Sequence, residues 1–199
     1  MSGKDLTRDI LVGGVVPFWR ILRIPLARLV RIARLVELRA AGVRTGPGVQ
    51  VYGKVRVQGT GRVALGERGN LYGEVVLETQ GEGRITIGDH FVLNQGTILC
   101  SMAEITMGNH VLVGEYVSIR DNDHEFTRDL EKDGGFVSTP IRIGNKVWIG
   151  RGCCLTRGVT IGDRSVIGAN SVVTKDIPPG SLAVGAPAKV IRNLLSEVS

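Results

Sequence analysis

Residues 143–174 read IGNKVWIGRGCCLTRGVTIGDRSVIGANSVVT, and an aliphatic residue recurs at every sixth position of this stretch. These positions are Ile143, Ile149, Leu155, Ile161, Ile167 and Val173. A period of six matches neither the 3.6-residue period of a helix nor the two-residue period of a strand. The chain must therefore bury one side chain and then turn a corner at regular intervals, as solenoid proteins do.

The positions beside the aliphatic residues indicate the same architecture. Glycine follows the aliphatic residue in four of the six repeats, and a small or β-branched residue fills the fifth position in each complete repeat. Glycine permits the close backbone approach that a bend between flat strands requires. Three such strands would form one triangular coil of three hexapeptides, so the pattern predicts an all-β fold, a parallel β-helix of hexapeptide repeats.

The repeat extends toward the N-terminus. Ile87, Leu93 and Leu99 keep the register, and Met107 resumes it after a spacing of eight, so two extra residues near Ser101 and Met102 should bulge at a corner. Alternation of apolar and polar residues begins near Val49. An antiparallel barrel of short strands is the alternative, and six consecutive matches at one spacing argue against it.

Composition and charge restrict the class of protein. With 199 residues, 43% of them hydrophobic, and 28 glycines, the chain is expected to form one domain with many tight turns. Residues 1–44 contain nine of the 25 Lys and Arg residues but three of the 19 Asp and Glu residues, which leaves 16 of each sign elsewhere. Nucleic-acid binding by the main body is therefore not expected.

Three cysteines, two of them adjacent, form neither a disulfide framework nor a CxxC zinc motif. A reducing cytoplasm is the expected compartment, and the N-terminus lacks the pattern of a secretory signal. The expected organisation is a basic N-terminal segment (1–42), a β-helix (43–187) with an active-site loop (121–140), and a C-terminal tail with a short helix (188–199).

The segment from Pro17 to Ala40 predicts an amphipathic helix with Pro25 in its first turn. One helical sector carries arginines and the opposite sector carries aliphatic residues: Arg20, Arg23, Arg31 and Arg34 against Leu22, Leu26, Leu29 and Ala33. Arginine interrupts every apolar run, so the helix should not span a bilayer. It either lies on the inner, anionic face of the membrane or packs across the end of the domain.

The C-terminal motif IGxxVWIGxxxxxxxGVTIGxxSVIGAxSVVTKDIPPxxxAxGxPAKVIR resembles the hexapeptide-repeat acyltransferases. It is most similar to maltose and galactoside O-acetyltransferases and to those of polysaccharide biosynthesis, over about residues 85–192. The resemblance implies a left-handed β-helix, a homotrimer, and acetyl-coenzyme A bound between subunits as the acyl donor.

A metal site is not expected. The histidines are His90, His110 and His124, and the first two occupy the same outward slot in GDH and GNH turns of different coils. Identical outward slots do not make a three-ligand zinc cluster.

His124 stands in RDNDHEF, where the repeat gives way to an irregular stretch that ends at Pro140. Sites usually occur in such insertions on a rigid scaffold. Transfer of an acetyl group to a hydroxyl needs a base, and neutral imidazole can accept the proton. His124 matches the catalytic histidine of the family. Asp121 is the chosen partner for its ring, with Asp123 as the alternative; both could instead be turn formers.

The acceptor site departs from the family pattern. Gly96 occupies the position of the family's acceptor-binding asparagine, and Asn94 lies two residues away. Asn94 and Asp123 are the candidate acceptor-binding residues.

The donor site follows the resemblance. Trp148 occupies an outward slot with Val166 beside it on the next coil, and the resemblance places this indole at a subunit interface beside the coenzyme thiol. The other residues that match family contacts are Gly150, Arg151, Ala169, Thr174, Lys175, Lys189 and Arg192. Generic trimer packing is the alternative for Trp148, and a solvated helix end is the alternative for Lys189 and Arg192.

The predicted reaction is direct transfer in a ternary complex: His124 deprotonates a sugar hydroxyl, which attacks the thioester while backbone amides stabilise the oxyanion. Cys153 occupies an inward slot, so a thiol nucleophile is rejected. The rivals are an acetyltransferase acting on serine or an amino sugar, and a scaffold without catalysis. If the N-terminal helix lies on a membrane, the acceptor should be a lipid-linked glycan or a nucleotide sugar.

Overall fold

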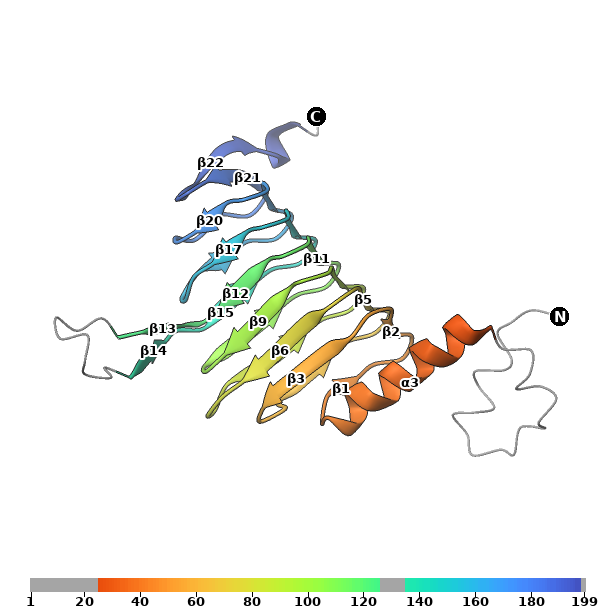
Figure 1. Ribbon diagram of the computed structural model, residues 1–199. Helices are drawn as coiled ribbons and strands as arrows, with labels where there is room; N and C mark the ends of the chain where they lie inside the picture. Colours follow the sequence, from red (N-terminus) through yellow and green to blue (C-terminus); the bar gives the residue numbers. More distant parts are fainter. Residues whose placement is uncertain (1–24, 126–134, 198–199) are drawn as a thin grey trace.

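The protein is a parallel β-helix whose N-terminal end is covered by one α-helix (Figure 1). The structure, a computed structural model, describes residues 25–125 and 135–197. Three parallel sheets, here named A, B and C, run along the axis, and the chain visits them in the order A, B, C in each coil. This arrangement confirms the predicted fold class.

Strands two to six residues long make up the sheets. Sheet A contains β1 (Arg44–Thr45), β4 (Val63–Leu65), β7 (Arg84–Ile87), β10 (Glu104–Met107), β15 (Ile141–Ile143) and β18 (Thr160–Ile161). Sheet B contains β2 (Gln50–Val51), β5 (Asn70–Leu71), β8 (Val92–Leu93), β11 (Leu112–Val113), β16 (Trp148–Ile149), β19 (Val166–Ile167), β21 (Ser181–Gly185) and β22 (Ala188–Asn193). Sheet C contains β3 (Val55–Gly59), β6 (Val75–Thr79), β9 (Ile98–Ser101), β12 (Ser118–Arg120), β17 (Cys154–Leu155) and β20 (Val172–Val173).

The core consists of the aliphatic column that the six-residue period predicts. All six aliphatic residues of the opening stretch are buried, and Ile149, Leu155, Ile161 and Val173 are 0% exposed. Ile143 pairs with Ile161, three hexapeptides further along the chain, which gives the predicted triangular coil. Gly150 is required at its bend, because a Cβ there would lie 2.7 Å from the backbone nitrogen of Ala169.

The N-terminal coils are longer than the coil from Ile143 to Ile161. Arg44 pairs with Ala64 and Ala64 pairs with Thr86, so each of these two coils contains more than three hexapeptides. The two residues between β9 and β10, at positions 102 and 103, lie outside the strands at a corner. The predicted bulge is therefore confirmed.

The three sheets differ in the side chains of their outer faces. Small, polar or basic side chains cover sheet A: Arg44, Ala64, Thr86, Thr106, Arg142 and Thr160. Mostly apolar side chains cover sheet B from its third coil on (Val92, Leu112, Trp148, Val166 and Leu182), after Gln50 and Asn70 in the first two coils. Sheet C carries one mostly apolar row (Val76, Ile98, Ser118, Cys154 and Val172) and beside it the polar side chains of Arg56, Gln58, Glu78 and Arg120. Sheet A is therefore suited to solvent, whereas sheets B and C offer surfaces for protein contact.

The helix α3 (Leu26–Ala40) packs across the N-terminal end of the β-helix. Leu38 is buried and Leu35 packs against the core. Pro25 is the N-cap, which corrects its predicted place in the first turn, and residues 17–24 of the predicted helix lie outside the described residues. Proline lacks an N–H, and its carbonyl accepts the first bond of the helix, from the Arg28 nitrogen at 2.7 Å.

The arginine sector of α3 faces the β-helix. The Arg31 guanidinium lies 5.1 Å from the ring centre of Tyr52, and Arg34 donates a hydrogen bond to the Tyr52 carbonyl. The aliphatic sector faces outward, where Leu26 is 77% exposed and Val36 is 59% exposed. Of the two predicted placements, packing across the end of the domain is observed, and it leaves the aliphatic sector uncovered by the described residues.

The C-terminus differs from the expected helix. Residues 188–193 form β22, antiparallel to β21, and only a 3₁₀ turn, Leu195–Glu197, follows within the described residues. The adjacent β-branched residues Val190 and Ile191 suit a strand, and β21 offers a free edge for pairing. No helix within the described residues is long and apolar enough to cross a membrane.

Candidate active site

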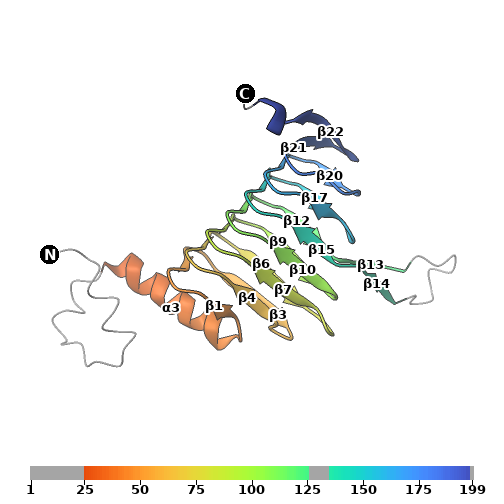
Figure 2. The same ribbon diagram turned by 180° about the vertical axis from the view of Figure 1, so that it is seen from behind.

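Two rows of turns position the predicted site residues. The C–A edge is the row that leads from sheet C into sheet A, at residues 60–62, 80–83, 102–103, 121–140, 156–159 and 174–176. The B–C edge is the row that leads from sheet B into sheet C, at residues 52–54, 72–74, 94–97, 114–117, 150–153 and 168–171. A hairpin of β13 (Asn122–His124) and β14 (Phe136–Ser138) projects from the C–A edge (Figure 2).

His124 lies at the outer end of this hairpin. It pairs with Phe136 across the two strands, and the ring centres lie 4.3 Å apart at a tilt of 40°. Both side chains are exposed. Sequence reasoning missed Phe136, because only pairing of the two strands reveals that this residue is opposite the histidine.

Asp123 links the hairpin to the next coil. Its Oδ2 atom accepts a hydrogen bond of 2.9 Å from Nε of Arg157, which belongs to the neighbouring turn of the C–A edge. The carboxylate predicted to contact the acceptor is therefore already paired with a cation, and the pair fixes the hairpin against the coil that follows.

Asp121 does not orient His124. Its side chain is 0% exposed and accepts hydrogen bonds from Ser101 Oγ (2.7 Å), Met102 N (2.8 Å) and Ala103 N (3.0 Å), and from Asn122 Nδ2 (3.2 Å). These donors occupy both carboxylate oxygens. The structure thus corrects the predicted pairing of Asp121 with the ring of His124. The carboxylate instead accepts hydrogen bonds from the bulge between β9 and β10, whose N–H groups have no partner among the described strands.

Asn94 and His124 lie at opposite ends of sheet C within one chain. Asn94 is in the B–C edge, where its Nδ2 donates to the Val113 carbonyl at 2.9 Å. Strand β9, which begins after this turn, contains four residues and spans about 13 Å. A single chain therefore does not bring the two predicted residues together.

The departure at Gly96 has a local cause. A Cβ at this position would lie 2.4 Å from Cδ1 of Tyr116, whose ring packs over Gly96 from the next coil. Gly96 also has a φ of +74°, which glycine adopts without strain. Tyr116, 57% exposed, thus occupies the space that a side chain at position 96 would need.

Most predicted donor residues gather around the outer face of sheet B and the B–C edge. Trp148 is 52% exposed and lies between Leu112 and Val166, with Gly150 and Arg151 in the turn that follows it. Ala169 is in the corresponding turn one coil later, and Lys189 pairs with Val184 across β21 and β22. Arg192 lies on the same strand, opposite Leu182.

Thr174 and Lys175 are separate from this group. They occupy the C–A edge, the same edge that carries the hairpin with His124. The indole and the imidazole therefore lie on different surfaces of one chain, and neither the predicted donor set nor the predicted acceptor set is collected in one place.

Other reactive side chains do not suit catalysis or metal binding. Cys153 is buried, its thiol donates to the Gly168 carbonyl at 3.1 Å, and burial raises the pKa of this thiol. His90 and His110 stack face to face, with ring centres 4.6 Å apart and planes 4° from parallel. In the part of the chain that the structure describes, no three His, Cys, Asp or Glu side chains gather into a possible metal site.

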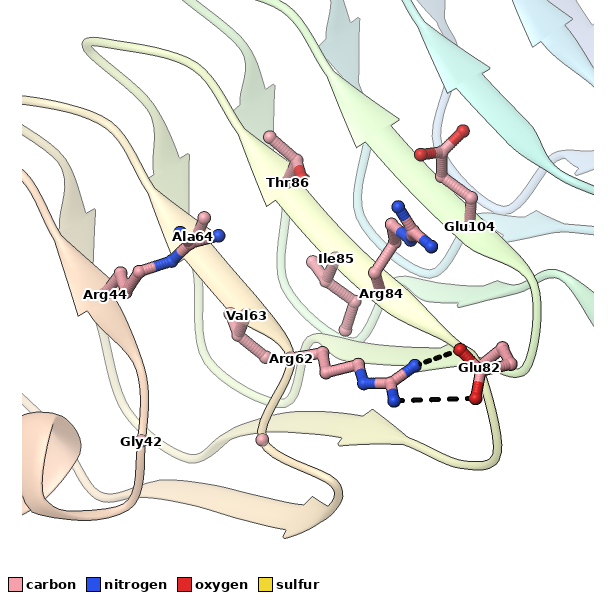
Figure 3. A pocket seen from close by; sticks show the side chains of 11 residues that line it. Gly42, Arg44, Arg62, Val63, Ala64, Glu82, Arg84, Ile85, Thr86 and Glu104 are labelled. Atoms are coloured by element: carbon pink, nitrogen blue, oxygen red, sulfur yellow. Dashed lines mark hydrogen bonds and ion pairs between the residues drawn. The ribbon is translucent and has the colours of Figure 1, made fainter.

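A groove of about 560 Å³ lies on the outer face of sheet A beside the C–A edge (Figure 3). Its charged residues are Arg44, Arg62, Glu82, Arg84 and Glu104. Arg62 contacts Glu82 through two hydrogen bonds of 2.5 and 3.5 Å. Hydrogen bonding to Arg62, and then its charge, hold the pKa of Glu82 below its ordinary value.

Comparison with known proteins identifies the family. The family model described as bacterial transferase hexapeptide (six repeats) matches residues 140–175. The maltose O-acetyltransferase structure from Clostridium difficile is 31% identical, with a TM-score of 0.63, over 88% of this chain and 81% of that one. The chain belongs to the family of hexapeptide-repeat acyltransferases.

Two further relatives bear on donor and acceptor. A hexapeptide-repeat acetyltransferase structure from Vibrio cholerae, in complex with acetyl-coenzyme A, is 30% identical with a TM-score of 0.60, over 82% of this chain and 77% of that one. Galactoside O-acetyltransferase of Escherichia coli is 44% identical over 110 residues, 55% of this chain and 54% of that protein. The chain spans about half the length of the curated relatives that it matches.

Proposed function

We propose that the protein transfers an acetyl group from acetyl-coenzyme A to a hydroxyl of a sugar or glycan, with His124 as the general base. The observation that carries this proposal is the hairpin that holds His124, exposed, at the C–A edge of the β-helix. The imidazole accepts the hydroxyl proton while the oxygen attacks the thioester carbonyl. The C–S bond then breaks, and the leaving thiolate receives the proton from the imidazolium.

The residues of sheet B fit the donor. Acetyl-coenzyme A has a long, largely uncharged arm and an anionic nucleotide end. The exposed indole of Trp148 and the small residues Gly150 and Ala169 offer a surface for the arm. Arg151 and Lys189, both exposed, supply cations for the phosphates, and Arg192, Thr174 and Lys175 complete the proposed donor set.

A homotrimer would bring together the two surfaces that carry Trp148 and His124, which we propose are two halves of one active site. The apolar outer faces of sheets B and C are two different surfaces of one chain, so one can contact the other across a rotation axis. Such a contact covers Leu112, which is 39% exposed, and brings the indole of one subunit toward the hairpin of another. The proposed active site therefore requires at least two copies of the chain.

The main alternative is acetylation of serine or of an amino sugar, which uses the same donor. The similarity to galactoside and maltose O-acetyltransferases favours a hydroxyl acceptor. A scaffold without catalysis is the other alternative, and the exposed imidazole of His124 argues against it. The described cysteines are all free, consistent with the reducing cytoplasm that we propose as the compartment.

The direct test is coenzyme A release from acetyl-coenzyme A, followed with a thiol reagent, in the presence of a panel of sugars. We expect release that depends on the sugar. Binding of the coenzyme without release for any acceptor would favour the scaffold, and release that depends only on serine would favour the first alternative.

Phe136 is proposed as a positioning residue for His124. Truncation in Phe136→Ala removes the ring that packs at 4.3 Å against the imidazole, so we expect kcat to fall about tenfold while KM for acetyl-coenzyme A stays unchanged. Phe136→Tyr keeps the ring and should restore kcat. An increase in acceptor KM with unchanged kcat would instead show that Phe136 contacts the acceptor.

The segment 17–40 is proposed to contact an anionic membrane surface through α3. Within it the outward face of α3 carries Leu26, Leu29, Val30 and Val36, each at least 38% exposed. This spacing places them on one side of the helix, while Leu38 and Arg31 face the β-helix. The excess of basic residues in 1–44 attracts the segment as a whole to anionic lipid, while within α3 Arg31 and Arg34 face the β-helix and Glu37 is exposed on the outward side. A lipid-linked glycan or a nucleotide sugar is the acceptor class that suits this location.

Two matched substitutions test the membrane contact. Val36, on α3, is 59% exposed, and Ile191, at the opposite end of the β-helix, is 61% exposed. We expect Val36→Glu to weaken sedimentation of the full chain with phosphatidylglycerol-containing vesicles by roughly tenfold, because a charge replaces an apolar contact. Ile191→Glu should have no effect. Equal loss in both variants, or none in Val36→Glu, would contradict the contact.

A further inference from the structure

The charged side chains of the groove on sheet A are three arginines and two glutamates, which leaves one net positive charge, and the charge of Arg84 acts on Glu82 as that of Arg62 does. Arg62 and Glu82 pair with each other. Within the described residues, neither Arg44 nor Arg84 forms an ion pair. Figure 3 shows the Arg84 side chain between Glu82 and Glu104. The groove therefore carries two guanidinium groups against one remaining carboxylate, that of Glu104.

The lining suits a ligand that is polar and extended. The outward side chains of Ala64 and Thr86 in its floor are small, and Gly42 and Gly61 add no side chain to its lining. Guanidinium groups bind carboxylates and phosphates with paired hydrogen bonds, and a carboxylate such as Glu104 accepts hydrogen bonds from sugar hydroxyls. Because the outer face of sheet A is polar, the proposed trimer leaves it open to solvent.

The groove ends beside the base of the hairpin that carries His124. Strands β1, β4, β7 and β10 line it, and β15, which follows the hairpin, pairs with β10. Asp121, at the base of the hairpin, binds the backbone of Met102 and Ala103 immediately before Glu104. From β15 to β1 is four strand spacings, or about 19 Å. His124 lies three residues beyond Asp121 along the hairpin, about 10 Å further, so a monosaccharide or a sugar nucleotide with its hydroxyl at His124 cannot place its charge at Arg44, whereas an oligosaccharide can.

We propose that this groove binds an anionic group of the acceptor, with Arg84 and Arg44 as its cationic contacts and the target hydroxyl at His124. The anion is the carboxylate of an acidic oligosaccharide or the diphosphate of a diphosphate-linked oligosaccharide, because the diphosphate of a single activated sugar is attached to the reacting sugar itself and cannot span this distance. The assignment of this ligand as the acceptor rests on the proposed acetyl transfer, whereas binding to the groove does not.

The experiment is equilibrium binding to the full chain, by calorimetry at low salt and without acetyl-coenzyme A. The probes are tetragalacturonate, maltotetraose as a neutral ligand of equal length, and UDP-glucose for the diphosphate. We expect at least one anionic probe to bind more tightly than maltotetraose. Whichever of tetragalacturonate and UDP-glucose binds more tightly shows whether the groove prefers a carboxylate or a diphosphate. The preference should fall as salt is added, because the groove is exposed.

Three substitutions give opposite expectations. Arg84→Gln and Arg44→Gln should each weaken binding of the anionic probe about two- to fivefold. Glu104→Gln should strengthen binding of the same probe by a similar factor. Arg164→Gln, at an exposed arginine in the turn before β19 and outside the groove, is the matched control and should change nothing. All four side chains are at least partly exposed, so the variants should fold.

Two results would overturn the proposal: no anionic preference in the wild type, or a preference that survives in Arg44→Gln/Arg84→Gln. Either result, together with sugar-dependent thiol release, would support the proposed acetyl transfer and contradict only the proposed binding of an anion in the groove. Conversely, anion binding with the expected response to all substitutions but without thiol release for any acceptor supports the groove as a binding site and contradicts the proposed transfer.

Discussion

Replacement of His124 by alanine is expected to reduce sugar-dependent coenzyme A release by a factor of roughly 10² to 10⁴. Positioned proton transfer contributes rate factors of this size, and an alcohol is a weak nucleophile until its proton leaves. The imidazole is exposed at the end of a hairpin, so its loss should barely change the free energy of unfolding. The same thiol assay measures the effect, with calorimetric binding of coenzyme A as a second measurement.

The matched control for His124 is another exposed histidine of the same chain. His110→Ala removes an imidazole from a turn that carries none of the proposed site, so thiol release should stay at the wild-type rate. Coenzyme A binding should persist in both variants, because the proposed donor residues lie on other turns. Full activity in His124→Ala would remove the histidine from the mechanism, and loss of coenzyme binding in that variant would mean that His124 holds the donor.

The repeat could be predicted from the sequence because its physical requirements are local. Each coil needs one aliphatic residue to fill the core and one small residue at each bend, and both recur at fixed spacing regardless of the rest of the chain. Even the bulge at residues 102 and 103 follows from counting between Leu99 and Met107. The outward slot of Trp148 follows from the same count, and the structure confirms its exposure.

The details of the candidate site could not be predicted in this way, because they depend on contacts between coils. Asp121 is three residues from His124 in sequence, yet its partners come from the coil before, at Ser101 and Met102. Phe136 meets His124 only because two strands of an irregular insertion pair. The C-terminal strand β22 likewise depends on the free edge of β21, which a pattern confined to residues 188–193 does not reveal.

Replacement of the buried Asp121 by alanine is expected to destabilise the fold by about 3 kcal/mol or more. The change removes the acceptor of the half-buried backbone N–H groups of Met102 and Ala103 and leaves the Ser101 hydroxyl only the Arg84 carbonyl at 3.1 Å, and each lost partner of this kind costs roughly 1 to 3 kcal/mol. At about 2 to 4 °C per kcal/mol for a chain of this size, Tm should fall by roughly 6 to 12 °C at a fixed protein concentration.

Asp123→Ala provides the matched control two residues away. The Asp123 side chain is 55% exposed and forms one ion pair at the surface, so its loss should cost less than about 1 kcal/mol. Thermal unfolding of the two variants therefore separates a carboxylate that holds the fold from one that ties the hairpin to Arg157. If Asp121→Ala kept the wild-type Tm and lost only kcat, the carboxylate would act on His124 after all, and the hydrogen bonds to the bulge would be secondary to catalysis.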